Sequence, residues 1–218
     1  MTFDIITIFP DIFNSYFSES IIKRAQEKKI IKIISHNLRT YSIDKHNTVD
    51  DRPYGGGAGM VLMAEPIIKT IKSIKKKSEK QKIILLSAKG KKWNQQLAKK
   101  YAKLDNITLI CGRYEGVDER VKKFVDEEIS IGDYVLTGGE IPAMIIIDSV
   151  TRLLPGVLGN EQSAQHESHS TKNILEHPQY TRPEVLTIGD KKLRVPKVLL
   201  SGNHAKIEKW RKQKSKLN

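Results

Sequence analysis

The sequence predicts an α/β fold in which a parallel sheet is covered by helices. Two near-continuous apolar runs, 82–87 and 106–112, have the length and composition of buried parallel strands. A lysine-rich segment with helical character, 91–103, lies between them, and alternation of strands with helices is typical of parallel sheets. The chain has 218 residues. At about 100–200 residues per domain, this length allows one large domain, or a domain with an appendage.

The other predicted elements continue this alternation. In chain order they are a strand at 3–9, a helical stretch at 11–29, a strand at 30–35, a polar loop to residue 59, a helix at 65–77 and a helix at 139–154. Pro10 closes the first strand, and proline is well suited to the first turn of a helix.

The composition changes after residue 155. Residues 160–180 are polar, contain three of the six histidines and lack periodicity, as in a linker or an ordered functional loop. Asn203 is suited to cap a basic helix that runs to residue 216. We therefore expect a first domain over residues 1–160, an inter-domain loop over 161–176 and a short helical domain over 177–218.

The charge of the chain favours anionic partners, nucleic acid first and anionic lipid second. The 38 Lys and Arg exceed the 25 Asp and Glu, which gives a net charge of +13. Residues 69–103 hold thirteen lysines and one acidic residue, a pattern that a solvated helix face explains equally well. No stretch has the roughly 18 apolar residues of a membrane span, and the first residues do not resemble a signal peptide. We expect a cytoplasmic protein.

Metal and nucleophile chemistry find little support in the sequence. The single cysteine, Cys111, ends a buried strand and is interpreted as a core thiol. His166 and His169 are three residues apart, whereas a zinc protease motif needs two histidines four apart on a helix. No metal site is predicted from these residues.

Glycine-rich turns are the strongest candidates for ligand binding. Residues 54–59 form the densest glycine cluster; they lack the Gly-Lys-Ser/Thr of a phosphate-binding loop, so a flexible loop is the simpler interpretation. Three further turns, 87–90, 111–116 and 131–140, each follow an apolar segment. Because ligands of open α/β sheets bind beyond the carboxyl ends of strands, these turns predict one crevice suited to an adenine and a ribose. Ordinary β–α turns are the alternative.

Several of these segments, taken together, resemble the bacterial tRNA (guanine-N1)-methyltransferases of the SPOUT class, which modify guanine 37 beside the anticodon. The resemblance is carried by residues 8–10, 49–57, 111–120, 131–142, 147–150, 155–161, 180–184 and 200–204. It implies a trefoil-knotted, S-adenosylmethionine-binding domain, a mostly helical C-terminal domain that binds the tRNA anticodon stem-loop, and a homodimer with active sites at the subunit interface.

The resemblance also implies roles for individual residues. Those that bind the cofactor are Leu86, Ser87, Gly112, Tyr114, Glu115, Ile131, Gly132, Asp133, Tyr134, Val135, Leu136, Gly138, Gly139 and Pro142. Those that bind RNA are Asp50, Arg52, Gly55, Gly56, Gly57, Ser168, His204, Lys209 and Arg211. Mg²⁺ is a further possible ligand, since a carboxylate such as that of Glu115 is able to hold one.

The resemblance also implies two catalytic residues, by their positions in the sequence. Guanine N1 carries a proton at neutral pH, so a general base must remove it before the nitrogen attacks a methyl group. Glu167 stands where the family has an aspartate base, with His166 and His169 as alternatives, and Arg152 is the cation that stabilises charge developing toward guanine O6.

Two departures from the family keep other functions open. The base is a glutamate, and the chain ends at Asn218, where the family has further helices. The alternatives are a SPOUT methyltransferase acting on another RNA site and a non-catalytic RNA-binding protein.

Overall fold

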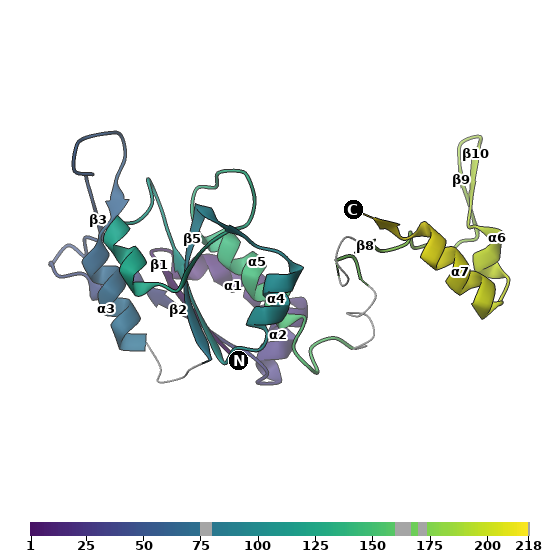
Figure 1. Ribbon diagram of the computed structural model, residues 1–218, viewed down its shortest axis with the longest axis horizontal. Coiled ribbons are helices and arrows are strands. Elements are labelled where there is room, and N and C mark those ends of the chain that lie inside the picture. The colour runs from purple at the N-terminus through teal and green to yellow at the C-terminus, as the bar shows by residue number, and fades with distance from the viewer. Residues whose placement is uncertain (75–79, 160–166, 170–173, 218) are drawn as a thin grey trace. The chain divides into compact units, whose positions relative to one another are not determined.

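The computed structural model describes residues 1–74, 80–159, 167–169 and 174–217 (Figure 1). The chain forms two compact units, Met1–Gly159 and Asn160–Asn218. The last part of the helix predicted over 65–77 lies outside the described residues.

The first unit is built on a five-stranded sheet with the order β2-β1-β6-β5-β7, and every neighbouring pair is parallel. The strands are β1 (Thr2–Thr7), β2 (Lys32–Asn37), β5 (Gln81–Lys92), β6 (Asn106–Cys111) and β7 (Glu127–Ser130). All six residues of β6 are buried, as expected for a strand covered on both faces. The predicted α/β class with a parallel sheet is confirmed.

Helices cover both faces of this sheet (Figure 1). One face packs on the 3₁₀ helix η1 (Pro10–Phe13), α1 (Asn14–Phe17), α2 (Ser20–Glu27), α4 (Gln95–Tyr101) and α5 (Glu140–Thr151). The other packs on η2 (Leu38–Tyr41), α3 (Ala64–Ile74) and η3 (Glu119–Phe124). Alternate side chains of a strand point to opposite faces, so Ile84 and Leu86 enter the first core and Ile83 and Leu85 the second. Two short strands, β3 (Asp50–Asp51) and β4 (Val61–Leu62), pair beside the sheet.

The predicted strands at 3–9 and 30–35 and the helix at 139–154 are shifted or shortened by up to three residues at their ends in the structure. Two other predicted elements of this unit differ more. The helical stretch at 11–29 is divided, because Glu19 is extended and Ser20 has a φ of 51°, which ends helical geometry there. β5 continues to Lys92, so the helix expected from residue 91 begins only at Gln95, where the Asn94 side chain accepts a hydrogen bond from the amide of Leu97.

The second unit contains one predicted helix and several short strands that were not predicted. α7 (His204–Lys214) begins after Asn203, whose side chain accepts from the amide of Lys206, as expected for its cap. An antiparallel hairpin of β9 (Val185–Ile188) and β10 (Lys191–Arg194) precedes α6 (Lys197–Leu200). β8 (Ile174–Leu175) pairs with β11 (Lys216–Leu217). Within the described ranges, none of the helices has the length and apolar character needed to cross a membrane.

Candidate functional site

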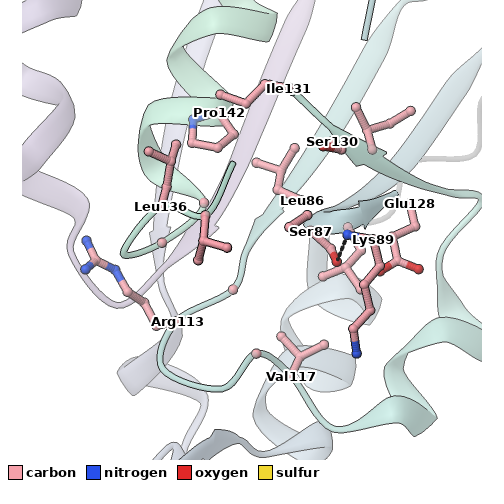
Figure 2. A pocket seen from close by; sticks show the side chains of 18 of the residues that line it. Leu86, Ser87, Lys89, Arg113, Val117, Glu128, Ser130, Ile131, Leu136 and Pro142 are labelled. Carbon is pink, nitrogen blue, oxygen red and sulfur yellow. Dashed lines mark hydrogen bonds between the residues drawn. The ribbon is translucent and has the colours of Figure 1, made fainter. Parts of the chain in front are cut away.

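The irregular stretch of β5 at 86–89 and the turns that follow β6 and β7 meet in one pocket of the first unit, with a volume of ≈ 240 Å³ (Figure 2). The turn predicted at 87–90 is therefore wrong: these residues lie within β5, where its pairing with β7 changes register. Of the fourteen residues predicted to bind the cofactor, thirteen line it: Leu86, Ser87, Gly112, Tyr114, Glu115, Ile131, Gly132, Tyr134, Val135, Leu136, Gly138, Gly139 and Pro142. Asp133 is not in the lining; its carboxylate is paired with the ammonium of Lys92. The carboxyl ends of parallel strands share one edge of a sheet, which is why turns distant in sequence converge here.

The pocket has an apolar part and a polar part. Figure 2 shows the side chains of Leu86, Leu136 and Pro142 gathered on one side, and those of Lys89 and Glu128 on the other. The amide of Lys89 donates to Ser87 Oγ at 3.1 Å, which stabilises the irregular stretch of β5. Such a lining suits a ligand with an apolar ring and several polar atoms.

Two glycines allow α5 to begin directly against the end of β6. The amide of Gly139 donates to the carbonyl of Gly112 at 2.9 Å. A Cβ on Gly139 would lie 2.6 Å from the Cα of Cys111, and one on Gly138 would lie 2.3 Å from Nε of Arg113. Any larger residue would therefore displace this side of the pocket.

The base of the glycine-rich loop is attached to the turn after β6. The amide of Glu115 donates to the carbonyl of Met60, and the amide of Leu62 to that of Gly116, both at 3.0 Å. A Cβ on Gly59 would lie 2.8 Å from the carboxylate of Glu115. The structure thus places one end of this loop beside the pocket.

The residues predicted to bind RNA in this loop are mostly exposed. Gly55, Gly56 and Gly57 have positive φ values, the backbone conformation that favours glycine. Arg52 is exposed, and Asp50 is partly buried in β3.

The predicted catalytic and C-terminal residues are distributed over both units. Arg152 is partly buried at the C-terminus of α5, in the first unit. Glu167 and Ser168 belong to the second unit, where Ser168 Oγ accepts from the amide of Glu176 at 2.9 Å. His169 has a φ of 65°, whereas His166 lies outside the described residues. His204, Lys209 and Arg211 are exposed on α7.

Three residues that were not predicted from the sequence, Thr7, Arg113 and Glu140, are joined by hydrogen bonds at the wall of the pocket. Glu140 is 1 % exposed, and its carboxylate accepts from Thr7 Oγ1 at 2.8 Å and from Arg113 Nε at 3.0 Å. An acidic residue in the first turn of α5, directly after two glycines, was the available signal, because carboxylates favour helix N-termini.

Comparison with known protein families gives a match over the whole length of the chain. Residues 1–218 match the family described as tRNA (Guanine-1)-methyltransferase TrmD. The chain belongs to this family. The resemblance inferred from the sequence segments is confirmed.

Curated relatives of the tRNA (guanine-1)-methyltransferase family cover nearly the same length. Proteins named tRNA (guanine-N(1)-)-methyltransferase are 53% identical in Citrifermentans bemidjiense, over 98% of this chain and 84% of the relative, and 54% identical in Carboxydothermus hydrogenoformans, over 100% and 84%. The relative from Clostridioides difficile is 52% identical over 99% of this chain and 92% of its own length.

The structure also bears on two other chemistries, that of a reactive cysteine and that of a bound metal ion. Cys111 is buried, which raises the pKa of its thiol well above the usual value, and the carboxylate of Glu140 raises it further. The interpretation of Cys111 as a core thiol is confirmed. In the part of the chain that the structure describes, no three His, Cys, Asp or Glu side chains are grouped to hold a metal ion, so the expectation of Mg²⁺ has no support there.

Proposed function

We propose that this chain transfers a methyl group from S-adenosylmethionine to N1 of guanine 37 in tRNA. The observation that carries the proposal is the pocket formed by the irregular stretch of β5 and the turns after β6 and β7, in a chain that belongs to the tRNA (guanine-1)-methyltransferase family. When bound, the cofactor supplies a methyl group on a positively charged sulfur. The remaining chemistry falls to the residues of the protein and to the tRNA.

The pocket residues fit the cofactor in two respects. The side chains of Leu86, Leu136 and Pro142 offer an apolar surface for the adenine ring. Gly138 and Gly139 allow the start of α5 to pack closely against the end of β6, which gives this wall of the pocket its shape. In this proposal the thirteen lining residues named above hold the cofactor, and Asp133 contributes through the turn that it shares with them.

Glu167 is the proposed general base and Arg152 the proposed electrostatic stabiliser. The carboxylate accepts the N1 proton of guanine, which frees the lone pair on N1 to form the new N–C bond, and the former C–S electrons remain on the sulfur. Arg152 stabilises the negative charge that develops toward O6. His169 and His166 remain alternative bases.

We also propose the homodimer and the knot of the SPOUT class. An apolar surface of five exposed side chains supports the dimer: Phe9, Ile12, Tyr16, Ile141 and Ile145 are each between 39% and 51% exposed, on η1, α1 and α5 or next to them. Tyr16 donates to Asp148 at 2.5 Å, and this bond raises its pKa to about 12, so the hydroxyl stays protonated. An exposed apolar surface of this kind marks an interface. For the knot, Gly90 supports a close crossing: a Cβ there would lie 2.5 Å from the backbone of Glu128.

The tRNA is the proposed macromolecular partner. The net charge of +13 provides attraction for a polyanion, and Lys209 and Arg211 are exposed on α7. In this proposal the glycine-rich loop, with Asp50, Arg52 and Gly55–Gly57, contacts the nucleotides next to the target guanine; the hydrogen bonds between the end of this loop and the turn after β6 support it. We assign the anticodon stem-loop as the region contacted and the cytoplasm as the location of the reaction.

A methyl-transfer assay tests the proposal. Unmodified tRNA and labelled S-adenosylmethionine are incubated with the protein, beside a tRNA in which guanine 37 is replaced by adenine. Transfer to the first tRNA alone supports the proposal. Equal transfer to both indicates another RNA site, and absence of transfer together with absence of cofactor binding in equilibrium dialysis indicates a non-catalytic RNA-binding protein.

A further inference from the structure

Glu140 forms part of a buried network directly behind the pocket wall. It is the first residue of α5 and is 1 % exposed. One carboxylate oxygen accepts from Thr7 Oγ1, at the carboxyl end of β1, at 2.8 Å. The other accepts from Nε of Arg113, in the turn after β6, at 3.0 Å. Both oxygens are therefore engaged, each by a different segment of the sheet edge.

The network closes on itself through Phe9. Thr7 Oγ1 accepts from the amide of Phe9 at 3.0 Å while it donates to Glu140. The guanidinium of Arg113 lies 4.7 Å from the centroid of the Phe9 ring, in a cation–π contact. Phe9, Thr7, Glu140 and Arg113 thus form a ring of contacts in which each residue is held by two others.

Arg113 connects this ring to the pocket lining. A second nitrogen of its guanidinium donates to the carbonyl of Thr137 at 3.3 Å, and its backbone is bridged to that of Gly138. Arg113, Thr137, Gly138 and Gly139 all line the pocket. The carboxylate of Glu140 itself lies behind them, so its effect on the pocket passes through these residues.

Burial makes this arrangement sensitive to the charge of Glu140. A carboxylate removed from water is costly unless a cation and hydrogen-bond donors compensate it. Arg113, Thr7 and the N-terminus of α5 supply this compensation here. Loss of the charge would release Arg113 and, with it, the turn at Thr137.

We propose that Glu140 is a positioning residue for the S-adenosylmethionine pocket: its buried carboxylate holds Arg113 and thereby fixes the turn 137–139 against the turn after β6. This inference rests on the proposed function and deepens it, since it assigns to Glu140 a share of the cofactor affinity.

The substitution Glu140→Gln tests it with little change in volume. Glutamine has one oxygen in place of two and carries no charge, so it cannot accept both bonds or neutralise Arg113. We expect the Kd for S-adenosylmethionine, from equilibrium dialysis well below the melting temperature, to rise about tenfold, the effect of losing a charge-assisted hydrogen bond. The KM for the cofactor should rise in parallel, with kcat at saturation changed by less than about threefold.

A pair of substitutions at Thr7 provides a test that does not remove the buried charge. Thr7→Val deletes the hydroxyl that fixes the carboxylate and should raise the Kd for the cofactor by about threefold. Thr7→Ser keeps the hydroxyl and should retain the wild-type Kd. Glu127→Gln is the matched control, because Glu127 forms a partly buried ion pair with Lys82 in the same sheet and is not among the pocket residues.

The outcomes separate the inference from the function on which it rests. Unchanged cofactor affinity in folded Glu140→Gln, with only a lower melting temperature, overturns the positioning role. If Glu140→Gln does not fold, equal affinities of Thr7→Val and Thr7→Ser overturn it. A loss of affinity in Glu127→Gln as large as that in Glu140→Gln does the same, since the effect would then be general. A wild-type protein that does not bind the cofactor contradicts the proposed function itself.

Discussion

At the scale of single residues, the proposed base differs from the family pattern by one methylene. A glutamate carboxylate extends more than about 1 Å further from the backbone than an aspartate carboxylate, while their ordinary pKa values are similar. The longer side chain requires the backbone at Glu167 to lie further from the guanine than the backbone of an aspartate would. Arg152 is the C-cap residue of α5, and its amide donates to the carbonyl of Asp148, so the helix fixes its backbone.

The first prediction concerns this base. Glu167→Gln should lower the single-turnover rate of methyl transfer at least about 100-fold, because the amide cannot accept the N1 proton. The Kd for S-adenosylmethionine should stay within about twofold of wild type. Glu176→Gln, a neighbouring carboxylate in the same unit, is the control. Full activity of Glu167→Gln would transfer the role of base to a histidine.

A second prediction at this scale concerns Gly139. Gly139→Ala should abolish measurable cofactor binding, since the new Cβ would lie 2.6 Å from the Cα of Cys111 and would displace the start of α5. Gly159→Ala is a matched control, because a Cβ at Gly159 would contact no atom within 4 Å. Calorimetric titration with the cofactor measures both. Wild-type affinity in Gly139→Ala would show that α5 does not need this close contact.

At the scale of elements, α7 carries the charge proposed to contact tRNA. Its last turn holds Arg211, Lys212 and Lys214, and Glu208 is the one acidic residue within His204–Lys214. Lys212 is 3.6 Å from Glu208 and is thus paired on the helix. Exposed basic side chains of this kind bind phosphates mainly by releasing counterions.

The third prediction measures this contribution. Lys209→Ala with Arg211→Ala should make the plot of log Kd for tRNA against log salt shallower by about 1.4–1.8, which corresponds to two phosphate contacts. The control removes the same charge from α3, as Lys69→Ala with Lys72→Ala. An equal change in both proteins would contradict a specific role for α7 and indicate a general effect of net charge.

Elements also show where sequence patterns mislead. The run of isoleucines and leucines in β5 identified a strand, yet the strand continues to Lys92, because after a shift of register Lys91 and Lys92 pair with Ile129 and Ser130 of β7. The hairpin of β9 and β10 was missed for a similar reason: most of its residues are exposed, so no buried face imposes an alternating pattern.

At the scale of the whole molecule, the apolar surface on η1, α1 and α5 carries the prediction of dimerisation. Ile145→Glu should dissociate the homodimer in sedimentation velocity, because a charge would be buried in the interface. It should also lower methyl transfer at least about tenfold if the active sites lie between subunits. Ile43→Glu is the control, since Ile43 is 60% exposed and lies outside this surface. A dimer that persists in Ile145→Glu would place the interface elsewhere.

The residues of the pocket illustrate how far sequence reasoning reached. Three glycine-bearing segments were predicted to converge because parallel strands end at one edge, and thirteen of the residues named for the cofactor do line one pocket, although the first segment lies within β5. Asp133 was assigned to it by the run of residues around it, but its side chain is held by Lys92 instead. Thr7, Arg113 and Glu140 were missed, because Glu140 contacts Thr7 over 133 residues and Arg113 over 27, and such contacts leave no local pattern.

By itself, the sequence determined the parallel α/β architecture, the family and the candidate cofactor turns, because hydrophobic periodicity and short motifs are local properties of the chain. The tertiary structure alone decided which of these turns meet, how far β5 extends and how the charge of Glu140 is compensated. These depend on contacts between distant segments, whose energies arise only when burial brings a carboxylate, a guanidinium and a hydroxyl out of water together.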